Sequence, residues 1–263
     1  MISITNPKVA CFVPQWAPYR GFSLLFDNPG ASVSPLGRDW LKVDCSVGEN
    51  DELRLYAGFA QFLKELGQHR LTNTYLFCPL PPDSYHVTVW DGLNDGNVHK
   101  ASAIHRGKLE AFLAGLPDSL LIDEEFTGEV HRSPLVTRRN WSIKFRFSAL
   151  AKRGNQSLVA RLMPADGDSE RELERILSDR AALSTRFREQ FGIEVQGRYS
   201  PHVTLGYFAN EEYAELSTPH ITRWNESVKN KVDRLTITFS SVSLYGFTDM
   251  STFFKGSNRK ATG

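Results

Sequence analysis

One short sequence occurs twice in the chain, once in each half, and no other feature constrains the fold as strongly. Residues 85–89 read Tyr-His-Val-Thr-Val, and residues 201–205 read Pro-His-Val-Thr-Leu. The elements predicted around the two copies follow the same order: helix, strand, short turn, strand, helix, strand, at an offset of about 116 residues. The repeat predicts an α+β fold with two pseudo-symmetric lobes. In the predicted fold, each lobe is an antiparallel sheet with helices on its outer face, and a cleft lies between the lobes.

Apolar periodicity and strand signals give the elements of the first half. Apolar residues at helical spacing predict a helix over residues 50–66, which ends before Gly67, and another over residues 100–116. Strands are predicted over residues 40–47, 73–80, 85–90 and 126–131.

The second half repeats this order. A long helix is predicted over residues 169–191, with Ser169 and Glu172 as a capping box and Gly192 just past its end. Residues 210–229 are predicted to be helical as well. Strands are predicted over residues 141–150, 157–163, 193–196, 202–208 and 234–245, with a hairpin turn at residues 151–155.

These elements predict one bilobal domain over residues 1–263. Lobe one covers about residues 38–131 and lobe two about residues 141–254. Residues 1–37 are dense in proline and glycine, which indicates a loop-rich segment around at most one short strand, at residues 22–26.

Composition excludes several classes of protein. The 31 basic and 30 acidic residues balance, whereas a protein that grips long duplex nucleic acid is strongly basic. The three cysteines are widely spaced, which fits neither a zinc pattern nor a disulfide set and favours a reducing compartment. The first residues lack the features of a signal peptide, and no apolar run is long enough to span a membrane. We therefore expect a cytoplasmic protein that binds no membrane, and we expect it to be a monomer.

The repeated motif places histidine and threonine on one face of a strand. Side chains two positions apart project from the same side, about 6.5 to 7 Å apart, so His86 and Thr88 lie together, as do His202 and Thr204. Taken singly, each histidine could equally have an ordinary structural role, and the repetition is what favours a functional one. A third His-x-Thr sequence begins at His220 and lies in a polar stretch that reads as helix or helix break, so we assign it no function.

The two His-x-Thr motifs resemble the signature of the two-histidine (2H) phosphoesterase superfamily, which includes RNA 2′,5′-ligase-like proteins and cyclic phosphodiesterases. More narrowly, two segments resemble a branch of that superfamily known only as a domain of unknown function. They are Ser84-Tyr85-His86-x-Thr88-Val89-x-Asp91-Gly92 and Asp249-Met250-x-x-Phe253. The resemblance covers about residues 28–254.

Two imidazoles and two hydroxyls suit hydrolysis of a phosphodiester. One imidazole takes a proton from water and the other gives one to the leaving oxygen, while Thr88 and Thr204 donate hydrogen bonds to the phosphoryl oxygens. This chemistry needs no metal and no cofactor, and Asp83 beside His86 does not complete a metal site. We expect a metal-independent phosphodiesterase that acts on a cyclic phosphate, a short 2′,5′- or 3′,5′-linked nucleotide or an RNA end.

Two other functions stay open. One is a non-catalytic module that binds a nucleotide or an RNA end. The other is RNA end-joining, which reverses the same chemistry at the same site.

Three further residues are candidates for substrate binding. Trp90 lies two positions beyond Thr88 and should face the cleft, where it could stack on a base; Tyr207, at an odd spacing from Thr204, should face away. Tyr245 is a second stacking candidate, and Arg198 could contact a phosphate. Core packing and a solvated surface are the ordinary alternatives for these residue types.

Overall fold

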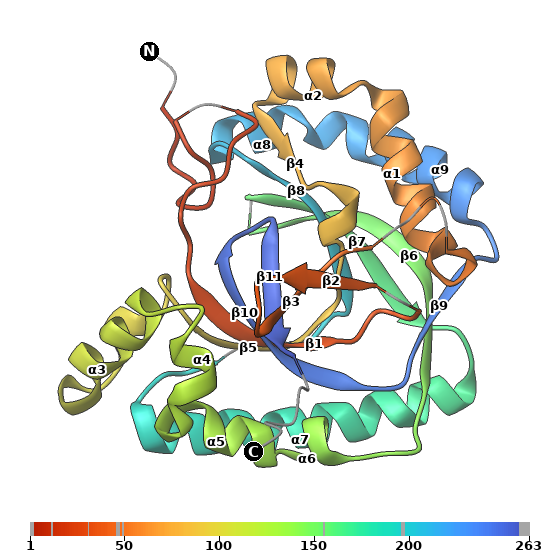
Figure 1. Ribbon diagram of the computed structural model, residues 1–263. Helices are drawn as coiled ribbons and strands as arrows, with labels where there is room; N and C mark the ends of the chain where they lie inside the picture. Colours follow the sequence, from red (N-terminus) through yellow and green to blue (C-terminus); the bar gives the residue numbers. More distant parts are fainter. Residues whose placement is uncertain are drawn as a thin grey trace.

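Two antiparallel sheets form the centre of the protein in a computed structural model (Figure 1). The structure describes residues 3–11, 13–30, 32–45, 48, 50–154, 156–195 and 198–257. Ser46, Val47, Asn155 and Gln196, which belong to predicted segments, lie outside the described residues. The predicted α+β class, with two antiparallel sheets, is confirmed.

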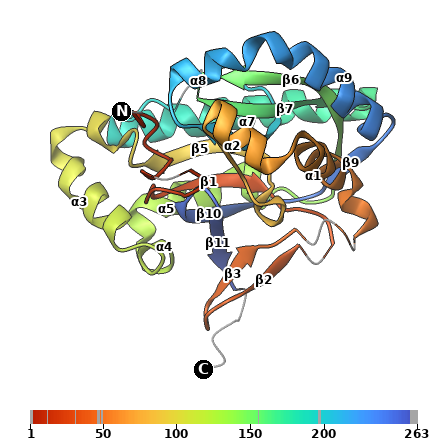
Figure 2. The same cartoon turned by 90° about the horizontal axis from the view of Figure 1, so that it is seen from above.

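The first sheet has six strands in the order β2-β3-β11-β10-β1-β5. Its strands are β1 (Gly21–Phe26), β2 (Val33–Leu36), β3 (Trp40–Val43), β5 (Thr88–Asn94), β10 (Val242–Asp249) and β11 (Thr252–Gly256). Strand β1 is buried along its whole length and pairs with β10 on one side and β5 on the other. In Figure 2 the strands β2, β3 and β11 project away from the second sheet.

The second sheet has five strands in the order β4-β8-β7-β6-β9. They are β4 (Phe77–Pro79), β6 (Ile143–Arg153), β7 (Ser157–Pro164), β8 (His202–Phe208) and β9 (Thr236–Phe239). A hairpin joins β6 to β7, as predicted, but Arg153 pairs with Ser157, so residues 151–153 belong to β6 and not to the turn predicted at residues 151–155. Along β6 the buried and exposed residues alternate at first, which is typical of a sheet with one face on the core.

Helices lie on both sides of the two sheets. In Figure 1, α1, α2, α8 and α9 gather on one side, and α7 runs along the opposite side. The α-helices are α1 (Arg54–Leu66), α2 (Gln68–Tyr75), α3 (Ala103–Ala114), α4 (Ser119–Ile122), α5 (Glu124–Arg132), α6 (Pro134–Thr137), α7 (Gly167–Phe191), α8 (Glu211–Leu216) and α9 (Ile221–Val232). Short 3₁₀ turns are η1 (Asp51–Leu53), η2 (Pro82–Ser84), η3 (Val98–Lys100) and η4 (Thr218–His220).

The two strongest helix predictions are confirmed, with a different cap on the second. Helix α1 follows a 3₁₀ turn that Asn50 caps, because the Asn50 side chain accepts a hydrogen bond from the Glu52 amide. Helix α7 begins two residues before Ser169, because Asp166 accepts the hydrogen bond of the Ser169 amide and acts as the N-cap. Gly192 ends α7 in the left-handed conformation, where glycine has no Cβ to clash.

The strand predicted over residues 126–131 is wrong, since this segment is the helix α5. Asp123 caps it through the amide of Glu125, and the basic His131 and Arg132 lie in its last turn. Phe126 and Val130, four positions apart, supply the buried face.

Two other strand predictions are wrong at least in part. Residues 73–80 were predicted as strand, but the chain is helical up to Tyr75 and forms a strand only in β4. Residues 193–195, also predicted as strand, are described outside any strand.

The sheets do not follow the predicted lobe boundaries at residues 38–131 and 141–254. Strands β10 and β11, from the end of the chain, lie between β3 and β1 in the first sheet. Strand β4, from the first half, forms an edge of the second sheet by pairing with β8. Each sheet therefore contains strands from both halves of the chain.

The N-terminal segment packs across both sheets. The amides of Thr5 and Asn6 donate to the carbonyl of Ala209, which follows β8, and the Tyr19 amide donates to Thr248 in β10. The predicted short strand in this region is β1. Within the described ranges, no helix is both long and apolar enough to cross a membrane.

Candidate active site

The two His-x-Thr segments meet at their central valines. Val87 and Val203 form an isolated antiparallel bridge between the two sheets, and both side chains are fully buried. Antiparallel pairing around this bridge sets Thr88 opposite His202 and His86 opposite Thr204.

All four polar side chains lie on the face opposite the valines. They are half-buried, as expected at the floor of a cleft. The two histidines are diagonal neighbours, and such neighbours in a regular antiparallel pair lie about 7–8 Å apart. That spacing leaves room for one phosphate between the imidazoles.

Both imidazoles are held in the same way. Nδ1 of His86 lies 2.8 Å from the carbonyl oxygen of Ser84, and Nδ1 of His202 lies 2.7 Å from that of Ser200. A carbonyl only accepts, so Nδ1 carries the proton in each ring and donates it. Nε2 of the neutral ring is then the lone-pair atom that can accept a proton in the cleft.

The surroundings favour the neutral form of both histidines. The pKa of His86 is lowered to about 4, mainly by burial and in smaller part by the charge of His202, while the Ser84 carbonyl and Asp91 act in the opposite direction. Burial also lowers the pKa of His202, and the nearby charges of Arg153 and Arg161 add to this. In the free protein at neutral pH, both imidazoles are therefore neutral.

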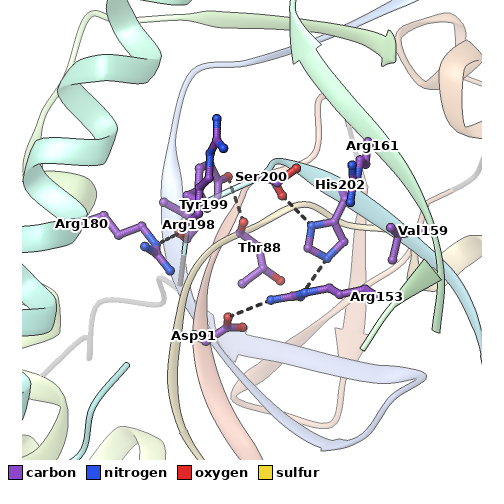
Figure 3. Close-up of a pocket in the computed structure, with 11 residues that line it drawn as sticks. Thr88, Asp91, Arg153, Val159, Arg161, Arg180, Arg198, Tyr199, Ser200 and His202 are labelled. Carbon is purple, nitrogen blue, oxygen red and sulfur yellow. Dashed lines mark hydrogen bonds and ion pairs between the residues drawn. The ribbon is translucent and has the colours of Figure 1, made fainter. Parts of the chain in front are cut away.

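A cavity of about 230 Å³ opens beside His202 (Figure 3). Its lining includes Thr88, Asp91, Tyr199 and His202, together with the predicted Arg198. His86 and Thr204 lie outside the lining of this cavity and on the other side of the valine bridge. The imidazole of His86 instead packs against Phe253 of β11, with ring centroids 4.1 Å apart.

Arginines dominate the charge of the cavity. Arg153 donates to Nε2 of His202 over 3.1 Å and lies 3.9 Å from the carboxylate of Asp91. Arg180 of α7 donates from Nε to the Val89 carbonyl over 3.1 Å. Arg161 and Arg198 complete the set of four arginines in the lining. Such a cavity suits an anionic ligand.

Most of these cavity residues were not singled out from the sequence. Arg161 shares the face of His202 because it is the register partner of His202 on β7, and the sequence alone did not give this pairing. Arg153 and Arg180 reach the cavity from a hairpin end and from a helix, and neither position follows from local sequence.

Trp90 does not face the cleft, contrary to the prediction. It is fully buried, and its Nε1 donates to Ser184 of α7 over 2.9 Å. The cause is a β-bulge: Leu24 and Leu25 are consecutive on β1, yet they pair with Trp90 and Thr88. The additional residue reverses the alternation, so that Asp91 faces the cavity in place of Trp90.

The second motif strand has a register shift at the matching place. On β7, Leu158 pairs with Gly206 and the next residue, Val159, pairs with Thr204. Tyr207 is therefore half-buried on the Thr204 side, where the predicted alternation had it facing away. The two motif strands thus share both the His-x-Thr sequence and the irregularity that follows it.

Tyr245 does not belong to this cavity either. It is buried in β10, and its hydroxyl donates to the Asp27 carboxylate over 2.8 Å. It lines a separate cavity of about 900 Å³ together with Asp27, Ser243 and Lys255. Pairing of β10 with β1, far along the chain, gives it this position.

His220 lies apart from the cleft, as predicted. It ends a 3₁₀ turn and packs against the rings of Tyr75 and Trp224. In the part of the chain that the structure describes, no three His, Cys, Asp or Glu side chains are arranged to hold a metal ion.

The segment Asp249-Met250-x-x-Phe253, which carries part of the narrower resemblance, has a structural role. Asp249 accepts hydrogen bonds from the amide and hydroxyl of Ser251, both at 2.7 Å, and so closes the turn between β10 and β11. This turn sets Phe253 against the His86 imidazole.

Comparisons with known proteins give a shared fold. No protein-family model and no curated protein matches the chain. Among solved structures it is similar to a conserved protein of unknown function from Agrobacterium tumefaciens, ATU0111. The identity is 12%, 96% of this chain and 89% of that chain are covered, and the TM-score is 0.51.

Two other solved structures are similar at lower scores. E. coli LigT complexed with 3′-AMP has 13% identity, coverage of 92% of this chain and 96% of that chain, and a TM-score of 0.38. Kluyveromyces marxianus Usb1 with uridine monophosphate has 11% identity, coverage of 89% and 99%, and a TM-score of 0.39. The chain therefore has the fold of the Agrobacterium protein, and on that fold its two His-x-Thr strands keep the resemblance to the two-histidine phosphoesterases.

Proposed function

We propose that this protein is a two-histidine phosphodiesterase that hydrolyses a cyclic phosphate, a short 2′,5′- or 3′,5′-linked nucleotide or an RNA-end phosphodiester without a metal ion. The observation that carries the proposal is the matched pair of imidazoles. Each donates from Nδ1 to the carbonyl two residues before it, and the Val87–Val203 bridge brings their strands together.

In this mechanism, the reacting phosphate lies between His86 and His202. One imidazole accepts a proton from the attacking water through Nε2, and the other, protonated, donates to the departing ribose oxygen. The bound anion raises the pKa of both imidazoles, which supplies the protonated partner. Thr88 and Thr204 donate to the phosphoryl oxygens as negative charge grows on them.

The arginines support an anionic substrate. Arg153 contacts Nε2 of His202 in the free protein, and a phosphate arriving there offers this guanidinium a charged acceptor instead. That exchange would release the lone pair of His202 for proton transfer.

The alternatives predicted from the sequence concern the same cleft. A non-catalytic nucleotide or RNA-end binder would not need two imidazoles constrained in the same tautomer. End-joining uses the same groups in reverse. We propose hydrolysis of a small nucleotide or RNA end by a cytoplasmic monomer that binds neither long duplexes nor membranes.

A substrate screen tests the proposal. Cyclic mononucleotides, RNA ends with a 2′,3′-cyclic phosphate and short 2′,5′-oligonucleotides are incubated with the protein in excess chelator. We expect turnover of at least one class in chelator, and its loss in the His86→Ala/His202→Ala double variant. Activity that chelator abolishes and a divalent ion restores would instead assign a metal-assisted reaction.

Supplying a free 2′- or 5′-hydroxyl acceptor to the same assay separates hydrolysis from ligation. Binding of these ligands with no turnover of any of them would assign a binding module.

A further inference from the structure

The cavity beside His202 carries more positive charge than one phosphodiester needs. Its described lining residues include four arginines and one carboxylate, that of Asp91. A phosphodiester has one negative charge, and the reacting one already has two imidazoles and two hydroxyls around it. Like charges held close together destabilise a site unless a ligand neutralises them.

The arginines fall into two groups. Figure 3 shows Arg153 and Arg161 near His202 on one side of Thr88, and Arg180 and Arg198 with Tyr199 on the other. Arg153 contacts His202 directly, and Arg161 is the register partner of His202. The first group therefore belongs with the reacting phosphate.

In the second group, Arg180 and Tyr199 form one wall of the cavity, and hydrogen bonds hold both side chains in place. The Arg180 guanidinium lies over the Tyr199 ring, 5.3 Å from its centroid, and Nε of Arg180 donates to the Val89 carbonyl. The Tyr199 hydroxyl donates to the Thr88 carbonyl over 3.0 Å, which ties this wall to the first motif strand. A guanidinium held in place loses less freedom when it binds a phosphate.

Arg198 adds a second cation to this wall. Its side chain is exposed and lines the cavity, and no hydrogen bond or ion pair joins it to any other described residue. It can therefore turn toward an anion without breaking a hydrogen bond or ion pair to a described residue.

We propose that Arg180 and Arg198, beside Tyr199, bind a second phosphate group of the substrate, separate from the phosphodiester that reacts at the histidines. The inference rests on the proposed phosphodiesterase function and narrows its substrate class. The substrate is a nucleotide with at least two phosphate groups, and the second group is either a terminal 5′-phosphate or the next diester of an oligonucleotide.

Three substrates at one ionic strength test the second phosphate. They are adenosine 2′,3′-cyclic phosphate, the same nucleotide with a 5′-phosphate, and a diadenosine dinucleotide that ends in a 2′,3′-cyclic phosphate and has no 5′-phosphate. Hydrogen bonds to charged groups are strong enough that we expect kcat/KM to rise roughly tenfold or more when the second phosphate is present. The 5′-phosphate nucleotide and the dinucleotide distinguish the two sources of that phosphate.

Variants test whether Arg198 is responsible for the preference for a second phosphate. In Arg198→Gln the preference for a second phosphate should shrink at least about fivefold, and Arg198→Lys should keep part of it. Arg223→Gln on α9 removes the same charge from an exposed position outside the cavity lining and should keep the full preference. Equal turnover of all three substrates by the unaltered protein, or a preference that survives in Arg198→Gln, would overturn the inference and leave the phosphodiesterase proposal intact.

A binding measurement separates the two proposals if none of the three substrates reacts. Calorimetric titration then compares adenosine 3′,5′-bisphosphate with adenosine 3′-phosphate. Tighter binding of the bisphosphate that is lost in Arg198→Gln supports the second phosphate site without the reaction. Equal affinities overturn it.

Discussion

The carbonyls of Ser84 and Ser200 hold the Nδ1 protons of the two histidines, which leaves Nε2 of each ring for proton transfer. Substitution of the histidines can separate proton transfer from packing. Asparagine carries its amide nitrogen near the place of Nδ1 and can still donate to the carbonyl, whereas neither asparagine nor glutamine can act as a proton-transfer group near neutral pH. We expect His86→Asn and His202→Asn to lower kcat/KM by about 10²- to 10⁴-fold, the usual contribution of a general acid or base.

Stability measurements complete this prediction. The asparagine variants should keep a melting temperature close to that of the unaltered protein and above that of the glutamine variants. His220→Asn, away from the cleft, should leave kcat/KM unchanged. Full activity in either cleft variant would remove that histidine from the mechanism.

The lowered pKa values of the two histidines set the expected pH dependence. The active free protein has one neutral and one protonated imidazole, a state that is populated between the two macroscopic pKa values of the pair. Burial lowers the pKa of both imidazoles from the ordinary value of about 6.5, so kcat/KM should reach its maximum on the acid side of that value. A bound phosphate raises both pKa values, so kcat should reach its maximum at higher pH than kcat/KM.

Arg153 offers a signed test of the same prediction. Its charge lowers the pKa of His202, so Arg153→Gln should move the kcat/KM profile to higher pH, whatever it does to the amplitude. Arg223→Gln should not move the profile. A maximum above pH 7 in the unaltered protein, or no displacement in Arg153→Gln, would contradict the assignment.

At the scale of single elements, periodicity predicted what local sequence controls. The helical spacing in α1 and α7 and the alternation around His86 and His202 all depend on neighbours within a few positions, and these predictions hold in the structure. The errors arise where one residue changes the period. A bulge after Thr88 turns Trp90 to the core, and a cap at Asp123 makes a helix of a segment rich in strand formers.

The bulge leads to a prediction about Trp90. Its ring packs against Phe187 of α7 and its Nε1 donates to Ser184, so we expect Trp90 to stabilise the fold and not to bind the substrate. Trp90→Ala should lower the free energy of unfolding by about 3–5 kcal/mol. Trp90→Phe should lower it by about 1 kcal/mol through the lost hydrogen bond and leave KM within about twofold. Denaturant unfolding and steady-state kinetics measure the two effects. A raised KM in Trp90→Phe with unchanged stability would return Trp90 to the substrate.

At the scale of the whole molecule, the histidines meet only because the two halves of the chain are interleaved. From the repeat we predicted that each half of the chain forms one lobe. A repeat carries no information about which strands of one half join the sheet of the other half. In the structure, β10 and β11 fill the middle of the first sheet and α1 packs on α9. Contacts between residues so distant in sequence leave no local pattern, which is why the fold class could be predicted and the strand order could not.

Interleaving predicts that the first half of the chain does not fold independently. A cut between Arg139 and Asn140, in the connection from α6 to β6, leaves a fragment of residues 1–139 whose strand pairs β2–β3 and β1–β5 have lost the two strands that join them. This fragment has no continuous sheet to cover its apolar residues, and an isolated strand pair is at best marginally stable. Circular dichroism of the 1–139 fragment should show no cooperative thermal transition. Mixing it with residues 140–263 should restore one, together with any activity of the intact chain. A cooperative transition in the 1–139 fragment alone would mean that the first half carries a core of its own and would contradict this prediction.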